Sequence, residues 1–205
     1  MTQTYLHQIP HIRDSLTYLM STDPVFKKLD LDMATFPWPH FDGGFEGLAR
    51  IVIGQQISTS AAKALWSKMF DRIDPLTPAN FLEQSDETLK SIGLSRQKQS
   101  YVRGLAQAIQ EGRFDTSDLD KMTDDEVRIY ITQLKGFGDW SANIYLLFCL
   151  ARPDVWPAGD LGIRYGLQKY LNMTEPPDVK QTQMEKDRFT PHCSAASLLL
   201  WSLKE

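Results

Sequence analysis

Two glycines separated by a single residue mark the segment best suited to hold a phosphate group. Gly136 and Gly138 lie in residues 134–142, between a helical pattern that starts near Asp124 and a strongly apolar helical pattern that follows. Glycines at this spacing allow the backbone to turn tightly and to approach another surface. The first amides of the second helix then lack intrahelical partners and can bind phosphate without a net positive protein. The same pattern also fits an ordinary helix–helix turn with glycine caps.

A single carboxylate in a glycine- and proline-rich loop is the second candidate for chemistry. Asp160 belongs to the run Trp-Pro-Ala-Gly-Asp-Leu-Gly-Ile-Arg at residues 156–164, and a helical pattern carrying Ile163 and Leu167 begins there. Taken alone, an aspartate in this place is most simply the N-cap of that helix. A role in a reaction therefore depends on what accompanies it.

The elements that must position these residues are all helical. Strand signals are weak, whereas helix starts are well marked at Thr77-Pro78, at residues 85–87 and at the capping box of residues 123–126. An apolar helical period over residues 45–70 is interrupted at 54–58, where a glycine weakens the helix and a serine can cap the next one.

We therefore predict an all-α chain with two helical lobes that share one domain, residues 1–205. One lobe spans about residues 35–135, and the other combines residues 1–34 with 136–205. Trp66 and Trp156 are assigned to the core, and the active-site cleft is expected between the lobes.

The composition is that of an ordinary globular protein. The chain has 205 residues, 42% apolar and 23% charged, which suffices for one large domain or two small lobes. Two cysteines, Cys149 and Cys193, cannot build a disulfide scaffold or a cysteine-ligated metal cluster, so buried free thiols are expected. No segment resembles a signal peptide or reaches the ~18 apolar residues of a membrane span.

The charge balance argues against a protein that coats DNA non-specifically. The net charge is −4 and the isoelectric point about 5.6, whereas neutralising many phosphates needs clustered Lys and Arg. The charge is uneven: residues 90–113 carry five basic side chains and one acid, and residues 115–126 carry six acids and one lysine. Two solvated helix faces of opposite sign would also explain this pattern.

Taken together, five segments resemble the helix-hairpin-helix (HhH-GPD) DNA glycosylase superfamily. Besides the hairpin and the loop that ends at Asp160, they are the Gly-Gln-Gln segment 45–58, the Gly-Leu-Ser…Lys segment 92–98 and the C-terminal segment 191–201. They occur in the family's order over about residues 40–203 and are most similar to the 3-methyladenine DNA glycosylase II branch. The hairpin alone would also fit ligases, polymerases and repair scaffolds.

The resemblance implies a role for each matching residue. Asp160 takes the position of the catalytic carboxylate, and Gln56 takes that of the side chain that fills the gap left by a flipped nucleotide. The other residues implied to bind DNA are Lys98, Gly136, Gly138, Asp139, Ser141 and Ala142. The residues implied to line the base pocket are Trp140, Ile144, Leu161 and Trp201. Family members often hold a monovalent cation, Na⁺ or K⁺, by main-chain carbonyls at positions that match Thr132, Leu134 and Phe137.

The implied activity is hydrolysis of the N-glycosidic bond of alkylated purines, such as 3-methyladenine and 7-methylguanine, in double-stranded DNA. The base must be flipped out of the helix before it can react. The indoles at positions 140 and 201 would favour a cationic base. Asp160 would stabilise the positive charge that develops on the sugar. A monomer is expected, in the nucleoid-containing cytoplasm of a bacterium or in a eukaryotic nucleus.

One position indicates that the enzyme would leave the DNA strand uncut. Bifunctional relatives carry a nucleophilic lysine where this chain has Trp140, and without it no Schiff base with the sugar can form. The four-cysteine iron–sulfur loop of other relatives is absent, so no cofactor is expected beyond the hairpin cation. Ile144 and Leu161 replace aromatic residues of the branch, which leaves the preferred lesion open.

Three other readings remain at this stage. A non-catalytic helix-hairpin-helix DNA-binding module would keep Gly136 and Gly138 but would need neither Asp160 nor an aromatic pocket. A helical interaction protein is suggested only by the acidic isoelectric point. A glycosylase for oxidised or mismatched bases is disfavoured by the missing lysine and cysteines.

Overall fold

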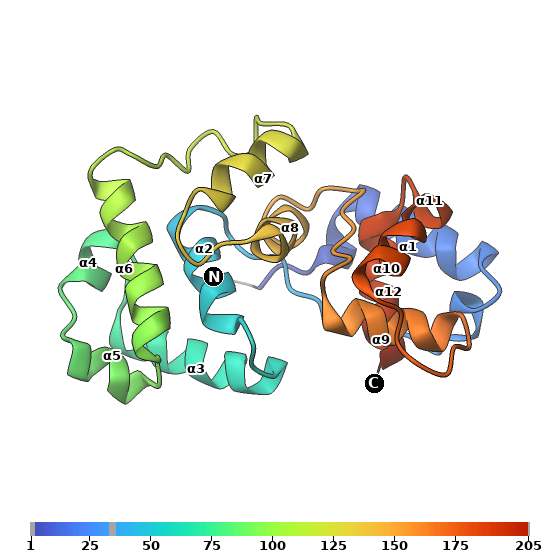
Figure 1. Cartoon of the computed structure of the whole chain (residues 1–205), viewed down its shortest axis with the longest axis horizontal. Helices are drawn as coiled ribbons and strands as arrows, with labels where there is room; N and C mark the ends of the chain where they lie inside the picture. Colours follow the sequence, from blue (N-terminus) through green and yellow to red (C-terminus); the bar gives the residue numbers. More distant parts are fainter. Residues whose placement is uncertain (1–2, 33–35, 205) are drawn as a thin grey trace. The chain divides into compact units, whose positions relative to one another are not determined.

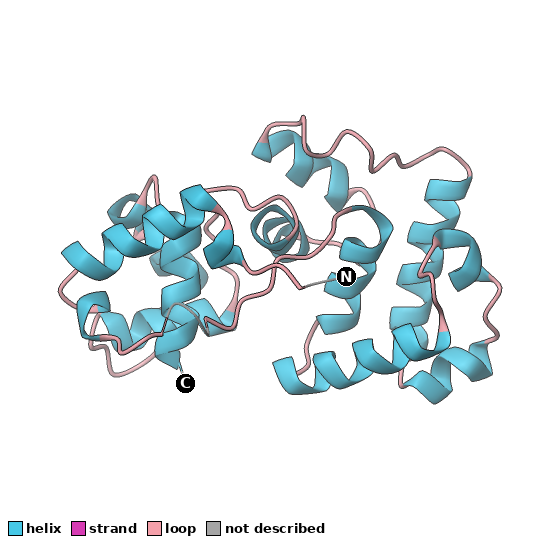
Figure 2. Cartoon of the chain, turned by 180° about the vertical axis from the view of Figure 1, so that it is seen from behind, coloured by secondary structure: helices cyan, strands magenta, loops and turns pink. Residues whose placement is uncertain are grey.

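The chain folds into two compact helical units, which the computed structural model describes over residues 3–32 and 36–204. Unit 2 is residues 42–145, and unit 1 combines the segments on either side of it, up to residue 41 and from residue 146 onward. Figure 1 traces the path of the chain, and Figure 2 shows helices joined by loops. An isolated bridge between Tyr5 and Pro39 is the sole β pairing among the described residues. The all-α prediction is confirmed.

The helices follow one another in chain order within each unit. Those of unit 2 are α2 (Gly44–Gly54), α3 (Thr59–Arg72), α4 (Pro78–Leu82), α5 (Asp86–Ile92), α6 (Arg96–Gln110), α7 (Asp124–Thr132) and most of α8 (Asp139–Phe148). Those of unit 1 are η1 (Leu6–Gln8), α1 (Pro10–Thr22), η2 (Phe26–Lys28), α9 (Leu161–Tyr170), α10 (Val179–Met184), α11 (Lys186–Phe189) and α12 (Cys193–Lys204).

The boundary between the units differs from the predicted one. We predicted that residues 136–145 belong with the C-terminal lobe, but they belong to unit 2. Two contacts account for this: the Tyr145 hydroxyl accepts a hydrogen bond from the Gly44 amide at 3.0 Å, and Gln55 binds the hairpin. The boundary falls inside α8, where a continuous helix carries no sequence signal for it.

Side-chain caps fix where the helices of unit 2 begin. The hydroxyls of Ser58, Thr77, Ser85 and Thr123 each accept a hydrogen bond from a first-turn amide, as the sequence predicts. Glu126 completes the predicted capping box by accepting from the Thr123 amide at 2.8 Å. Local capping chemistry thus sets where α3, α4, α5 and α7 begin.

Aromatic side chains pack the interior of each unit. Trp66 is buried in unit 2 beneath the Arg50 guanidinium, whose carbon lies 3.9 Å from the centre of the indole. In unit 1 the buried Trp156 donates from Nε1 to the Thr182 carbonyl at 2.9 Å. Both tryptophans are core residues, as predicted.

Close approach of two helices organises unit 1. A Cβ atom added to Gly166 of α9 would lie 2.1 Å from the carbonyl oxygen of Leu200 in α12. The backbones therefore meet where a larger residue would hold them apart. This contact fixes the start of α9, and so Asp160, against α12.

The two cysteines are buried free thiols, as predicted. Burial, together with the neighbouring Asp154 carboxylate, raises the pKa of Cys193 to about 12. The thiolate is therefore strongly disfavoured, and Cys193 has the character of a small apolar core residue.

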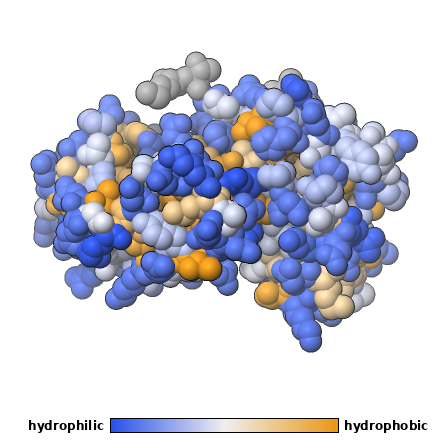
Figure 3. Space-filling view, turned by 90° about the horizontal axis from the view of Figure 1, so that it is seen from above, coloured by the Kyte–Doolittle hydropathy of each residue, from blue (hydrophilic) through white to orange (hydrophobic). Residues whose placement is uncertain are grey.

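Hydrophilic side chains cover most of the visible surface, and the apolar patches on it are small (Figure 3). The exposed large apolar residues include Ile129, Leu161 and Met184. Within the described residues, no helix is long and apolar enough to cross a membrane.

Candidate DNA-binding hairpin and catalytic carboxylate

The predicted hairpin is a tight turn between α7 and α8 in unit 2. Gly136 has a φ of +94°, in the left-handed region that favours glycine. A Cβ atom there would lie 2.3 Å from the Tyr101 ring, which packs against the turn. The Phe137 amide donates to the Leu134 carbonyl at 3.1 Å and closes the turn. Glycine at position 136 is therefore required both for the backbone conformation and for space.

The amides available to a phosphate are those at the very start of α8. Ala142 is fully buried, and its amide donates to the Gly138 carbonyl at 3.1 Å. The first intrahelical hydrogen bond uses the Ala142 amide, so this geometry does not favour its predicted contact with DNA. Helix geometry leaves the preceding first-turn amides without intrahelical partners. Gly138 and Asp139 are both exposed there, and the Asp139 carboxylate leaves only its main chain suited to an anion.

A residue that the sequence analysis did not single out ties the hairpin to a second loop. Gln55 Nε2 donates to the Gly136 carbonyl at 2.9 Å and to the Ser141 hydroxyl at 3.0 Å. Ser141 is buried, so its hydroxyl serves this internal contact. The double Gln in the Gly-Gln-Gln segment was the available signal, but nothing local distinguishes the first glutamine from the second.

The loop that Gln55 anchors presents Gln56 to solvent. Gln56 is exposed and has a φ of +58°, a left-handed conformation that is uncommon for a residue with a side chain. Such conformations persist where surrounding contacts impose them, and they cluster at functional sites. Gln56 is thus exposed on this loop, as its predicted role in filling a gap in DNA requires.

Lys98 supplies one of those contacts. Its Nζ donates to the carbonyls of Ile53 at 2.6 Å and Gln55 at 2.9 Å, at the C-terminal end of α2. A cation in this place satisfies carbonyls that the helix leaves unpaired and complements the helix dipole. Burial lowers the pKa of Lys98. The predicted DNA contact is not what this geometry favours: Lys98 organises the loop that carries Gln56.

We expect Gln55→Leu to loosen the hairpin. The change leaves the Gly136 carbonyl and the Ser141 hydroxyl without their donor, which should lower the free energy of unfolding by ~1–3 kcal/mol. Urea unfolding and amide hydrogen exchange over residues 136–141 would measure the effect. Gln168→Leu is the matched control, because Gln168 Nε2 also donates to a main-chain carbonyl, that of Thr174 at 2.9 Å, but lies in unit 1. Unchanged exchange in the hairpin of the Gln55 variant would contradict the bracing role.

In unit 1, Asp160 is both a helix cap and part of a second contact. Its Oδ1 accepts from the Ile163 amide at 2.9 Å and from Trp201 Nε1 at 2.8 Å. The N-cap reading is thus correct, but it is incomplete, because the indole of α12 also orients the carboxylate. Trp201 is buried and packs on Trp38 and Phe148, with ring centres 5.3 and 5.7 Å away.

A glycine makes the approach of the indole possible. A Cβ atom on Gly162 would lie 2.7 Å from Trp201 Cδ1 and 3.0 Å from Asp160 Oδ1. Gly162 therefore leaves the space in which the indole and the carboxylate meet. Gly162 belongs to the loop motif of residues 156–164, but the sequence alone assigns it no role.

The other predicted pocket residues are divided between the units. Trp140 and Ile144 are four residues apart on α8 in unit 2, so they share one face of that helix. Ile144 is buried, whereas Trp140 is partly exposed. Leu161 follows Asp160 in unit 1 and is 53% exposed. Thr132 and Leu134, predicted cation ligands, are partly buried beside the hairpin turn, and Phe137 is buried.

Comparison with known proteins identifies the family to which the chain belongs. The model of the HhH-GPD superfamily of base excision DNA repair proteins matches residues 49–191. The chain belongs to this superfamily. The match contains α3 to α11, and so includes both the hairpin and Asp160. The predicted family is confirmed.

Two similar proteins are both named as DNA-3-methyladenine glycosylases. DNA-3-methyladenine glycosylase 1 of Schizosaccharomyces pombe is 29% identical over 162 residues, which cover 77% of this chain and 71% of that protein. A DNA-3-methyladenine glycosylase of Saccharomyces cerevisiae is 30% identical over 195 residues, covering 78% of this chain and 66% of the relative.

A solved structure extends the likeness to three dimensions. The Schizosaccharomyces pombe 3-methyladenine DNA glycosylase in complex with abasic DNA matches with a TM-score of 0.77 and 25% identity. The match covers 92% of this chain and 95% of that one. This HhH-GPD chain therefore shares its fold with a protein that was captured on DNA.

Proposed function

We propose that this HhH-GPD protein is a monofunctional DNA glycosylase that excises alkylated purines. The observation that carries the proposal is the Asp160 carboxylate, oriented by Trp201 Nε1 at 2.8 Å in a chain that also has the glycine-rich hairpin. A DNA-binding module would need the hairpin but not the indole that holds the carboxylate. The names of the relatives, DNA-3-methyladenine glycosylases, support alkylated purines as substrates.

The hairpin and its neighbouring loop would grip and open the DNA. The first amides of α8 would bind a backbone phosphate, with Gly136 and Gly138 allowing the close approach. Gln56, which is exposed, would occupy the gap left by the flipped nucleotide. Extruding a base costs a few kcal/mol, and least for a damaged one.

Asp160 would act on the sugar. Alkylation at N3 or N7 makes the purine cationic and a good leaving group, so the reaction needs little acid catalysis. As the glycosidic bond breaks, positive charge develops on the sugar, and a fixed carboxylate stabilises it and orients water for the attack. Trp140 and Trp201 would favour a cationic base through their electron-rich rings. Trp140 stands where a nucleophilic lysine would be needed to cut the strand, so the abasic product should stay uncut.

A monovalent cation at the hairpin is part of the proposal. Carbonyl oxygens are suitable ligands for Na⁺ or K⁺. The Leu134 carbonyl accepts one hydrogen bond, from the Phe137 amide, and keeps a second lone pair. With Thr132 and Phe137, this donor set fits such an ion, which would add positive charge beside a phosphate. We propose no other cofactor, and a monomer acting where double-stranded DNA lies, in a bacterial nucleoid or a eukaryotic nucleus.

Base release from methylated DNA tests the proposed function. Wild-type protein is incubated with methylated duplex DNA, the freed bases are separated and quantified, and the DNA is run on a gel before and after alkali. We expect free 3-methyladenine, with strand breaks only after alkali. DNA binding without release of any base would favour the non-catalytic module, and breaks before alkali would contradict the monofunctional assignment.

We expect Trp201→Phe to slow the reaction without weakening DNA binding. Phenylalanine keeps an aromatic ring against Trp38 but removes the N–H that holds Asp160. The single-turnover rate should fall ~10-fold, the cost of one hydrogen bond to a charged group. The dissociation constant for abasic DNA should change less than twofold. A loss of affinity with an unchanged rate would show that Trp201 does not act through the carboxylate.

A further inference from the structure

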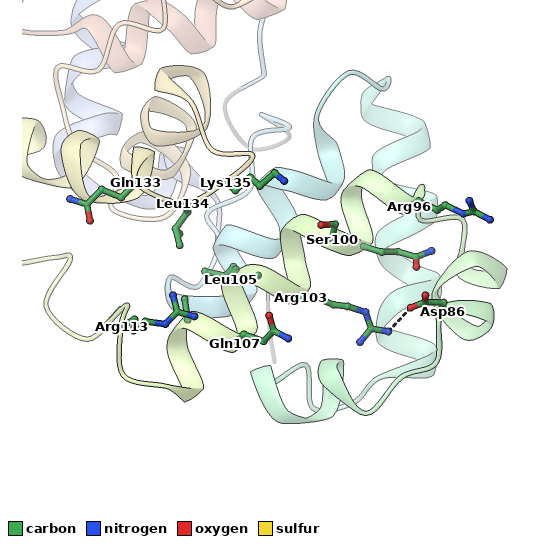
Figure 4. A pocket seen from close by; sticks show the side chains of 13 residues that line it. Asp86, Arg96, Ser100, Arg103, Leu105, Gln107, Arg113, Gln133, Leu134 and Lys135 are labelled. Atoms are coloured by element: carbon green, nitrogen blue, oxygen red, sulfur yellow. Dashed lines mark hydrogen bonds and ion pairs between the residues drawn. The ribbon is translucent and has the colours of Figure 1, made fainter.

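A cavity with a basic lining adjoins the hairpin in unit 2. A cavity of about 630 Å³ opens along the exposed face of α6, between the start of α5 and the turn before Gly136 (Figure 4). Its lining includes Arg96, Arg103, Arg113 and Lys135 but only one carboxylate, Asp86. We call this cavity the α6 groove. It concentrates positive charge on a chain whose net charge is −4.

Two of the four cations are already engaged within the protein. The Arg103 guanidinium donates to the carbonyls of Leu82 and Gln84 and to the Asp86 carboxylate at 3.0 Å, as the dashed line in Figure 4 marks. Arg113 pairs with the Glu111 carboxylate. These contacts fix the wall of the groove and leave their charges partly neutralised.

The other two cations are available to a partner. Arg96 and Lys135 are both exposed, and within residues 3–32 and 36–204 neither forms an ion pair. Lys135 directly precedes Gly136, and Arg96 opens α6. The groove therefore joins the hairpin turn to the first turn of α6 with unpaired positive charge at both places.

The remaining lining favours a phosphate backbone as the occupant. Arg96, Ser100, Arg103 and Gln107 follow one another at spacings of four, three and four residues, so they form one stripe along α6. At 1.5 Å per residue this stripe is ~16 Å long, the rise of roughly five nucleotides in one strand of B-DNA. Arginine, lysine, serine and glutamine side chains are the usual donors to phosphate oxygens.

The lining also disfavours nucleobases. No aromatic residue lines the groove, whereas the binding of unstacked bases relies on aromatic platforms. The α6 groove is continuous with the hairpin, because Lys135 directly precedes Gly136, the glycine that would let a phosphate approach. This continuity favours DNA over an acidic protein segment as the occupant of the groove.

We propose that the α6 groove binds backbone phosphates of the DNA next to those held by the hairpin. This inference rests on the proposed function, since it adds to the grip of a DNA glycosylase. It gives a role to three of the five basic residues in the segment 90–113, Arg96, Arg103 and Arg113, which the sequence alone could not distinguish from a solvated helix face. It also explains how an acidic protein gains affinity for DNA from a few placed cations.

The salt dependence of binding tests the proposal. The variant is Arg96→Gln/Lys135→Gln, and the ligand is a 24-base-pair duplex with a stable abasic-site analogue. The plot of log K against log salt has a negative slope, and each lost phosphate contact makes it shallower by ~0.9. The slope of the double variant should therefore be shallower than that of wild type by about 1.8. The control is Lys90→Gln/Lys180→Gln, which removes two exposed lysines outside the groove and should keep the wild-type slope.

The outcomes separate the groove from the proposed function. A rate of base release at saturating enzyme equal to wild type, with the reduced slope, supports the proposal. An unchanged slope overturns it while leaving the glycosylase intact. An unchanged slope with lost binding to a poly-glutamate peptide would make the groove a protein-docking surface and also overturns it. Absence of base release by the wild type itself would instead refute the proposed function.

Discussion

Replacing Asp160 with asparagine should lower the single-turnover rate of base release by at least ~100-fold. Asparagine has the same shape, and its Oδ1 can still accept from the Ile163 amide and Trp201 Nε1, which lie 2.9 and 2.8 Å away. Asparagine is also as good an N-cap as aspartate. The variant therefore keeps the local structure and removes only the charge that stabilises the developing oxocarbenium ion.

The matched control is Asp178→Asn. Asp178 caps α10 in the same way, its carboxylate accepting from the Gln181 amide at 2.7 Å. It lies in no segment to which we assign chemistry, so this variant should react at the wild-type rate. Thermal unfolding would check that both variants are folded. If Asp160→Asn reacts within a few-fold of wild type, then Asp160 is a helix cap and no more.

The second large effect is expected on stability, from Gly166→Ala. The added Cβ atom would lie 2.1 Å from the Leu200 carbonyl oxygen and 2.6 Å from its carbon. Backbone atoms of a packed helix cannot move aside as a flexible side chain can. We expect the free energy of unfolding to fall by ~3 kcal/mol, and the melting temperature by roughly 6–12 °C for a chain of this length.

Gly104→Ala is the matched control for this change. Gly104 also lies in a helix, α6, but a Cβ atom there would meet nothing within 4 Å. Alanine should therefore stabilise the protein by ~0.5–1 kcal/mol through its higher helix propensity. Calorimetry of the two variants beside wild type should give shifts of opposite sign. A stabilised Gly166 variant would mean that α9 and α12 are free to separate.

The parts of this structure that sequence predicts well are those set by neighbours in the chain. Thr77, Ser85 and Thr123 cap helices because an oxygen lies three residues before an unpaired amide, and that relation is visible in the sequence. The hairpin is also predictable from local sequence, since Gly136 has a positive φ that favours glycine over other residue types. These local rules suffice for the all-α fold.

Contacts between residues far apart in the chain could not be predicted from the sequence. Gln55 and Ser141 are 86 residues apart, and Asp160 and Trp201 are 41 apart, so neither pair leaves a periodic trace. Lys98 illustrates the same limit. A basic residue in a DNA-binding segment predicts a phosphate contact, but its ammonium group reaches carbonyls that only the folded chain brings near it.

The glycine at position 162 and the indole at position 201 form a single evolutionary constraint. A methyl group at 162 would occupy the space of the indole that holds Asp160. Gly162→Ala should therefore be most harmful while the indole is present, and Trp201→Phe should offset part of its effect. We expect this positive epistasis to have constrained which substitutions could be accepted at the two positions. Lineages that keep tryptophan at position 201 should also keep glycine at position 162. A lineage that has lost the indole should tolerate a larger residue at position 162.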